Sequence, residues 1–288
     1  MVRMKSAQKM ALARMASCLV LGFRKRLGLS SRAVVRRQGL SWDLDLAEGI
    51  DLSVYLLGKF EPSTVRLYNR LVKPGSTVLD IGGNIGAHTL PLARLVGARG
   101  LVVAFEPTGY AIRKMRANIA QNPALADRIS IQQVMLVADG TKPLAPRLYS
   151  SWPLTKTGEA VHQEHGGRLM DTSGAVGMTL DEALRRMDVK SVDFIKMDVD
   201  GHEPGVLAGG KATLAAHKPR ILMEFAPYLF DPESGELESM LEMLESWGYS
   251  MSDVANRERL PFDPARLRKL VPVGQSRNVL LEATKGGH

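Results

Sequence analysis

The chain has almost no cysteine and no apolar run long enough to cross a bilayer. Cys18 is the one cysteine among 288 residues, so an intrachain disulfide is excluded, which fits a reducing compartment. The mostly apolar stretch 11–23 contains Arg14 and is too short for a transmembrane helix. With 45% hydrophobic and 24% charged residues, the composition is that of a globular protein with a sizeable core.

Acidic residues are absent from the first 42 positions, which hold ten Lys and Arg residues. The remaining 28 basic and 30 acidic residues give positions 43–288 a net charge of −2, although the whole chain carries +8. The excess positive charge therefore belongs to a basic N-terminal arm, residues 1–42. A nucleic-acid-binding surface spread over the whole fold is not expected.

The basic arm admits three interpretations. A basic start followed by an apolar run resembles the first two regions of a signal peptide, but Arg24, Lys25 and Arg26 follow directly and no small-residue cleavage site is in place. A basic amphipathic helix lying on an anionic membrane, through residues 1–37, is the second. We favour the third, a helix packed on the domain, and expect a cytoplasmic protein in which any membrane contact would be peripheral.

From residue 76 onward, short apolar runs alternate with helical patterns, which is typical of a parallel sheet covered by helices on both faces. We expect strands at 76–81, 101–106, 129–136, 192–199, 220–225, 249–254 and 278–284, and helices at 88–97, 108–121, 203–217 and 236–248. The stretch 141–178 lacks periodicity, and a loop of that length is usually functional. We interpret it as the substrate loop of one domain spanning residues 43–288.

Acidic residues end the expected central strands. They are Asp80, Glu106, Asp198 with Asp200, and Glu224. In open α/β sheets the ligand crevice lies outside the carboxyl ends of the strands. We therefore expect carboxylates from four strands to meet at one edge of the sheet.

A glycine turn follows the first of these strands, in the sequence VLDIGGNIGAHT. Its glycines are Gly82, Gly83 and Gly86. Position 84 is Asn84, so the spacing does not match the Gly-x-Gly-x-x-Gly of nicotinamide-binding proteins, and the Gly-Lys-Ser/Thr of phosphate-binding loops is absent. Lys and Arg are also absent from residues 78–93, so nothing there would neutralise a pyrophosphate. The turn favours a nucleoside ligand without phosphates.

S-adenosylmethionine fits this pattern. Asp80 could receive its ammonium group directly or through water, and the two oxygens of Glu106 could accept both ribose hydroxyls. The glycines would let the backbone approach the amino-acid portion of the ligand. The alternatives are that Asp80 only holds the turn by a local hydrogen bond, and that Glu106 caps or forms a salt bridge before Pro107.

Several segments, in order, resemble the FkbM-type S-adenosylmethionine-dependent methyltransferases. They are TVLDIGGNIGAHTLPLA, VVAFEP and VDFIKMDVDGHEPGVLAGG, flanked by GIDLSVYLLGKFEP and TLDEAL. The resemblance covers roughly residues 43–284. It implies a seven-stranded, mostly parallel Rossmann-like sheet with an antiparallel last strand, and methyl transfer to a hydroxyl of a sugar, glycan or secondary metabolite.

The resemblance also completes an expected donor site. Glu61 would border the donor pocket, with helix capping as the alternative, and His88 would contact the donor's carboxylate or simply begin a helix. The family commonly has Asp-x-Glu-Gly where this chain has Asp198, Val199, Asp200 and Gly201, one methylene shorter at position 200. The expected donor-binding residues are Glu61, Asp80, Gly82, Gly83, Asn84, Gly86, His88, Glu106, Pro107, Met135 and Asp198.

Candidates for a catalytic base follow the fourth and fifth strands. An alcohol is a poor nucleophile while protonated, so a positioned base should help by roughly 10²–10⁴-fold. His202 is our first choice because imidazole titrates near neutrality, and Asp198 would act in catalysis or contact the donor. Lys196 would stay protonated and orient the carboxylates, and Glu224 completes the catalytic set. A solvent-exposed His202 and a purely structural Lys196 ion pair are the alternatives.

Metal binding is the less favoured interpretation. Asp198, Asp200 and Glu224 could bind Mg²⁺, which prefers oxygen ligands, but their spacing matches no clear ligand pattern. His162 and His165 lie close to Glu164, yet no cysteine or third histidine accompanies them. We therefore expect a solvated loop there and predict no metal site.

The acceptor is expected beside aromatic side chains on or near the long loops. Tyr149, Trp152 and Tyr228, with Asp200, are the expected substrate-binding residues, and core packing is the alternative for the aromatics. We expect a small-molecule or glycan acceptor and no nucleic acid. Two other functions stay open: a non-catalytic donor-binding scaffold of a biosynthetic complex, and a nucleic-acid methyltransferase that uses the basic arm.

Overall fold

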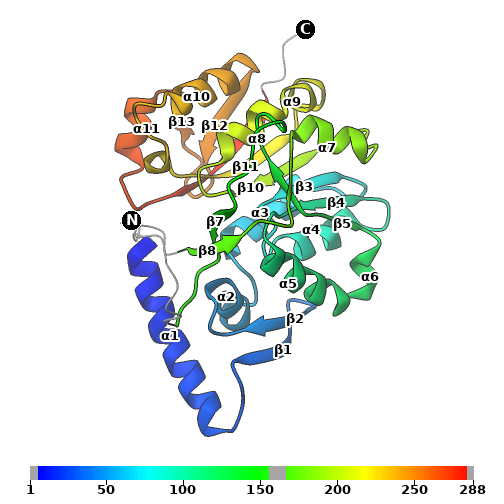
Figure 1. Ribbon diagram of the computed structural model, residues 1–288, viewed down its shortest axis with the longest axis vertical. Coiled ribbons are helices and arrows are strands. Elements are labelled where there is room, and N and C mark those ends of the chain that lie inside the picture. Colours follow the sequence, from blue (N-terminus) through cyan, green and yellow to red (C-terminus); the bar gives the residue numbers. More distant parts are fainter. Residues whose placement is uncertain (1–5, 156–166, 284–288) are drawn as a thin grey trace.

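The computed structural model describes residues 6–155 and 167–283, and one mixed sheet forms its centre (Figure 1). In spatial order its strands are β13 (Arg259–Leu260), β12 (Tyr249–Asp253), β14 (Arg277–Ala283), β11 (Arg220–Phe225), β10 (Phe194–Met197), β3 (Thr77–Ile81), β4 (Leu101–Phe105) and β5 (Ile129–Gln132). The strands from β11 to β5 are parallel to their neighbours, whereas β14 runs antiparallel to both β11 and β12. The mostly parallel sheet with an antiparallel last strand is confirmed.

The sheet has eight strands rather than the seven expected. The additional strand, β13, is two residues long and pairs antiparallel with β12 at the edge. The expected third strand is also shorter, because β5 ends at Gln132 and the following β6 (Val134–Leu136) pairs with β9 (Val176–Met178) instead. The chain leaves the sheet at Gln133, whose carbonyl oxygen accepts a hydrogen bond from the amide of Val176 (3.3 Å).

Helices cover both faces of the sheet, as the alternation predicted (Figure 1). They are α2 (Gly49–Leu57), α3 (Pro62–Leu71), α4 (Thr89–Val96), α5 (Gly109–Ala120), α6 (Pro123–Ala126), α7 (Leu180–Arg186), α8 (Glu203–Gly209), α9 (Lys211–His217), η1 (Pro227–Leu229), α10 (Glu236–Ser246) and α11 (Pro264–Leu270). The expected helix 203–217 is divided into α8 and α9. Gly210 separates them, and a Cβ there would lie 2.8 Å from the side chain of Leu180 in α7.

Alternate residues of the central strands point into two separate apolar layers. Leu79 and Ile81 of β3 pack in one layer with residues of α8 and α10, whereas Val78 packs in the other with residues of α4. Asp80 and Lys196 are register partners on β3 and β10, and Asp80 shares the face of Val78 because side chains alternate along a strand. The same alternation therefore brings polar side chains together at the carboxyl ends of the strands.

The N-terminal part forms α1 (Ser6–Arg26) and then a hairpin of β1 (Arg32–Arg37) and β2 (Leu40–Asp45). Gln38 and Gly39 make its two-residue turn, both with positive φ, as tight hairpins prefer. Leu40, Trp42 and Leu44 alternate inward and are buried. The hairpin crosses residue 42, where the sequence placed the end of the basic arm. Among the described helices, none is both long and apolar enough to span a membrane.

The long loop 141–178 has structure of its own. β7 (Arg147–Ser150) and β8 (Arg168–Asp171) form an antiparallel hairpin within it. The segment after β7 is tied to the start of α2, because the Gly49 amide donates to the Trp152 carbonyl oxygen (2.8 Å) and the Leu154 amide to that of Ala47 (2.8 Å). These bonds hold residues 148–152 where they form one wall of the cleft described next.

Candidate active site

A cleft of about 900 Å³, partly open to solvent, lies at the carboxyl ends of β3, β4 and β10. Most of the expected site residues line it: Gly82, Gly83, Asn84, His88, Glu106, Pro107, Met135, Tyr149, Trp152, Lys196, Asp198, Asp200 and His202. The expected residues outside this lining are Glu61, Asp80, Gly86, Glu224 and Tyr228.

The glycine turn is shaped by contacts within the protein. Gly82 has a φ of +83°, and a Cβ there would collide with the carbonyl oxygen of Asp198. A Cβ on Gly83 would lie 2.7 Å from the Cε of Met115 in α5. The amides of both glycines donate to the carbonyl oxygen of Phe105 (3.0 Å each). Packing against the backbone of Asp198 therefore requires a glycine at position 82, a reason that the sequence interpretation did not include.

Asp80 lies behind the cleft. Its carboxylate is fully buried, and Oδ2 accepts a hydrogen bond from Oγ1 of Thr89 (2.6 Å). Oδ1 has no hydrogen-bond partner among the described residues and lies 3.9 Å from Nζ of Lys196. Burial raises the pKa of Asp80, while the Lys196 ammonium and the Thr89 hydroxyl act to lower it. The local hydrogen bond that the sequence left as an alternative is thus present, and it joins the end of β3 to α4.

Glu106 reaches the cleft and is held firmly by its neighbours. Its Oε1 accepts hydrogen bonds from the amide (2.8 Å) and the hydroxyl (2.6 Å) of Thr108, and its Oε2 accepts one from the amide of Asn84 (3.0 Å). Burial raises the pKa of Glu106, and these hydrogen bonds to the ionised form lower it. A carboxylate has about four acceptor sites, so capacity for ligand hydroxyls is left.

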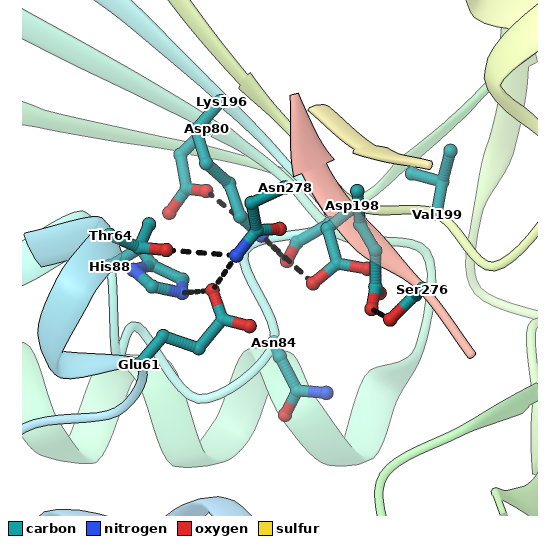
Figure 2. A network of polar contacts seen from close by, with 12 residues as sticks. Glu61, Thr64, Asp80, Asn84, His88, Lys196, Asp198, Val199, Ser276 and Asn278 are labelled. Carbon is teal, nitrogen blue, oxygen red and sulfur yellow. Dashed lines mark hydrogen bonds and ion pairs between the residues drawn. The ribbon is translucent and has the colours of Figure 1, made fainter. Parts of the chain in front are cut away.

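Lys196 is the one Lys or Arg among the residues that line the cleft. Its Nζ lies 3.4 Å from Oδ2 of Asp198 (Figure 2). It also lies 3.5 Å from the carbonyl oxygen of Gly82. Burial lowers the pKa of Lys196, but the surrounding carboxylates, Asp198 first, raise it above its ordinary value. Burial likewise raises the pKa of Asp198, and the Lys196 ammonium brings it below its ordinary value. The pair is therefore ionised.

Asp198, Asp200 and Glu224 bring carboxylate oxygens within 4.8 Å of one another. Burial, followed by the charge of Asp198, raises the pKa of Asp200 and of Glu224 well above the ordinary value of a carboxyl group. Glu224 is hydrogen-bonded to Asp198 and accepts a hydrogen bond from the hydroxyl of Ser276. The three-carboxylate cluster can thus share protons, and its oxygens are also the kind of ligand that Mg²⁺ prefers.

Glu61 and His88 belong to a polar network that the sequence did not predict (Figure 2). Asn278 of β14 donates to Oε2 of Glu61 (3.1 Å) and to Oγ1 of Thr64 (2.9 Å). His88 is hydrogen-bonded through Nδ1 to the hydroxyl of Tyr68 (2.9 Å), and its Nε2 lies 3.8 Å from Oε2 of Glu61. Burial lowers the pKa of His88 well below its ordinary value, so the ring is neutral.

The expected acceptor residues differ in their placement. His202 precedes α8, and its side chain lines the cleft and is open to solvent on one side. Desolvation on the protein side lowers the pKa of its imidazole. Tyr149 and Trp152 also line the cleft, and the ring of Trp152 lies 5.8 Å from that of Phe60, centroid to centroid. Tyr228 lies in η1, away from the lining. His162, Glu164 and His165 lie outside the described residues.

The chemistry of the cleft fits a cationic nucleoside better than a pyrophosphate compound. Among the lining residues, the carboxyl groups of Glu106, Asp198 and Asp200 outnumber the single ammonium of Lys196. Within the described chain, two buried polar atoms of lining residues have no hydrogen-bond partner, Asn84 Oδ1 and His88 Nε2. Buried polar atoms are normally paired. A ligand with both donors and acceptors would satisfy them.

The strand order of the sheet, together with the acidic residues at the carboxyl ends of its strands, defines a class I, Rossmann-like methyltransferase fold. A family model described as the methyltransferase FkbM domain matches residues 80–251. The chain belongs to the FkbM methyltransferase family. It is accordingly an S-adenosylmethionine-dependent methyltransferase, and S-adenosylmethionine is its cofactor.

Solved structures show distant likeness. Methyltransferase FkbM from Methylobacillus flagellatus has 15% identity and a TM-score of 0.43, over 75% of this chain and 50% of that one. Fibrillarin from Aeropyrum pernix with bound S-adenosylmethionine has 14% identity and a TM-score of 0.44, over 88% of this chain and 82% of that one. An O-methyltransferase from Bacillus cereus in complex with S-adenosylhomocysteine has 16% identity and a TM-score of 0.46, over 79% of this chain and 83% of that one. The chain thus spans about half the length of the Methylobacillus protein. A search of curated proteins gives no significant match.

Proposed function

We propose that this enzyme methylates a hydroxyl group of a sugar, glycan or secondary-metabolite acceptor. The observation that carries the proposal is a set of proton-accepting groups on the wall of the cleft that holds Glu106. A neutral imidazole, His202, and an ionised carboxylate, Asp198, both line that cleft. Acceptors that are already good nucleophiles need no base, whereas a hydroxyl does.

The donor would be held at the β3 and β4 side of the cleft. Glu106 is fixed by three hydrogen bonds and would accept those of the ribose hydroxyls. Asn84, with φ of +45° and an unpartnered Oδ1 in the described chain, points a further polar group at the same space. Bound S-adenosylmethionine supplies a methyl group on a positively charged sulfur, and the excess of carboxylates on the wall suits that charge.

The chain's own residues would then handle the acceptor's proton. His202 has a lowered pKa, so it is unprotonated near neutral pH and can accept a proton from a hydroxyl. Lys196 keeps Asp198 ionised, and Asp198 would orient the acceptor hydroxyl by accepting its hydrogen bond. Tyr149 and Trp152 would form the wall against which the acceptor packs. Orientation of the reacting groups is the main contribution expected from such a site.

The test is transfer of radiolabelled methyl from S-adenosylmethionine to a panel of mono- and oligosaccharides and phenolic or macrolide-type alcohols. A hydroxyl product is an ether, which survives mild alkaline hydrolysis, whereas a methyl ester does not. We expect alkali-stable label on at least one acceptor. Donor binding without turnover on any hydroxyl, or alkali-labile label only, would contradict the proposal.

The pH profile tests His202 directly. The wild-type rate should rise with pH through the lowered pKa of His202 and level off above its ordinary value of 6.5. His202→Gln should lower kcat by roughly 10²–10³-fold and remove that rise. His217→Gln, at the end of α9, is the matched control and should leave both unchanged. An unchanged rate in His202→Gln would show that a residue other than His202 acts as the base.

The same assay tests the metal alternative by adding EDTA and then Mg²⁺. We expect activity to persist in EDTA, because Glu224 is already engaged with Asp198 and Ser276. Loss of activity in EDTA that Mg²⁺ restores would instead make the three-carboxylate cluster a metal site.

A further inference from the structure

Helix α1 has two apolar faces, of which the fold uses only one. The inner face packs on the core through Met10, Ala13, Ala16 and Val20. It is anchored by Oγ of Ser17, which is buried and donates to the carbonyl oxygen of Leu46 (2.9 Å). The helix runs along the outside of the molecule beside α2 (Figure 1). Its other side faces solvent.

That outer face carries large apolar side chains. Leu12, Met15, Leu19 and Phe23 are exposed to 51%, 59%, 70% and 64%. Their spacing of three, four and four residues places them on one side of a helix. At 1.5 Å per residue the row is roughly 16 Å long. We call these four residues the outer stripe. Isolated exposed apolar residues are common, but a continuous row of this kind marks an interaction surface.

Positive charge surrounds the outer stripe. Lys9, Arg14, Lys25 and Arg26 of the same helix are exposed, and no described ion pair involves them. No acidic residue occurs in the first 42 positions, whereas residues 43–288 carry a net charge of −2. The charge and the exposed apolar side chains are therefore concentrated on the same helix.

We propose that the outer stripe of α1 docks on an anionic lipid bilayer surface. An interfacial helix buries its apolar side chains at the level of the headgroups while Lys and Arg interact with anionic lipids, and α1 offers both. A second copy of the chain fits less well, because it would bring two acid-free, basic helices together. A nucleic acid would leave Leu19 and Phe23 without an apolar partner. This inference does not depend on the acceptor of the reaction.

The experiment is co-sedimentation of the full chain with phosphatidylcholine vesicles, with and without phosphatidylglycerol, at low and high salt. We expect binding only to the anionic vesicles, weakened by salt because exposed charges are screened. The double variant Leu19→Glu/Phe23→Glu should bind at least about tenfold more weakly. Lys25→Glu/Arg26→Glu should also weaken binding and reduce its salt dependence.

The control is Val273→Glu, which changes an equally exposed apolar residue (64%) away from α1 and should bind like wild type. All replaced side chains are exposed, so unchanged thermal unfolding confirms that the variants fold. Sedimentation velocity of the wild type shows whether a second copy of the chain binds the outer stripe instead. A wild-type dimer that the double variant Leu19→Glu/Phe23→Glu dissociates, together with no vesicle binding, would overturn the proposal. Equal binding of wild type and double variant to anionic vesicles would also overturn it.

Discussion

Gly82 sits where the end of β3 passes the end of β10. Its φ is +83°, in the region that favours glycine, and its missing side chain leaves room for the carbonyl oxygen of Asp198. Gly83 and Gly86 make the same kind of room for Met115, at 2.7 Å and 3.1 Å from the Cβ that they lack. The turn therefore brings Asp198 and Glu106 to the same cleft by close backbone packing.

Gly82→Ala should destabilise the protein without any ligand. A non-glycine residue at this φ and a collision with backbone atoms together cost about 2–4 kcal/mol. Chemical denaturation of the ligand-free protein measures this free energy. Gly75→Ala, with φ of +87° and open space around its Cβ, is the control for the φ effect alone and should cost about 1 kcal/mol. Equal stability of Gly82→Ala and wild type would show that the packing argument is wrong.

Some residues of the site could be predicted because their signals are local. Lys196 and Asp198 are two positions apart on an extended strand, so their contact follows from the alternation of side chains. Asn278 is 217 positions from Glu61, and no periodicity links them. Tyr68 could not be foreseen either, since its partner His88 is brought near only when α3 packs against α4. The one available signal for Asn278 was a polar residue at the start of the expected strand NVLLEA.

At the scale of elements, α8 begins beside the cleft, which is lined by His202 before the helix and by Val206 within it. Glu203, its first residue, is buried, and its Oε1 accepts a hydrogen bond from the amide of Val199 (3.2 Å). Burial raises the pKa of Glu203 to about 7, although the backbone hydrogen bonds oppose the rise. This contact closes the turn that carries Asp200.

Glu203 should make stability depend on pH. The unfolded chain releases this proton near 4.5 and the folded protein near 7, so the folded state binds the proton more tightly between those values. The free energy of unfolding therefore falls as pH rises from 4.5 to about 7 and is level above. Glu203→Gln removes this contribution, so its stability relative to wild type should increase by of order 3 kcal/mol across the window.

Denaturation of wild type and Glu203→Gln at both ends of this pH window measures the difference. Glu182→Gln, a change at a half-buried side chain on the surface of α7, is the control and should track wild type at both pH values. If the free energy of unfolding of Glu203→Gln, relative to wild type, is no greater at about pH 7 than at pH 4.5, the raised pKa of Glu203 is contradicted.

The elements show where sequence reasoning succeeds and fails. The parallel strands and their helices are mostly apolar and periodic, and most of them lie close to the expected ranges. The β1–β2 hairpin was not predicted, although Leu40, Trp42 and Leu44 alternate and Gln38-Gly39 marks a turn. The basic residues Arg36 and Arg37 were instead included in the basic arm of residues 1–42, which was expected to be helical. β6 pairs with β9 instead of continuing the main sheet, and the paired residues are 42 positions apart, so this pairing depends on tertiary structure.

At the scale of the whole molecule, opposite charges are separated. The basic arm, with ten cations and no acid, contrasts with the remainder at −2 and with a cleft whose wall is rich in carboxylates. A cationic donor suits the cleft, and an anionic surface suits α1. The two regions therefore have distinct electrostatic partners, and changes in one should leave the other's binding intact.

The central claim is that the cleft at the carboxyl edge binds S-adenosylmethionine through Glu106. Calorimetric titration of S-adenosylhomocysteine into wild type, Glu106→Gln and the control Glu182→Gln tests it most directly. We predict binding by wild type and control, and roughly 10–100-fold weaker binding by Glu106→Gln, because hydrogen bonds to a charged acceptor are lost. Equal affinity of wild type and Glu106→Gln, with both proteins folded, would contradict the claim.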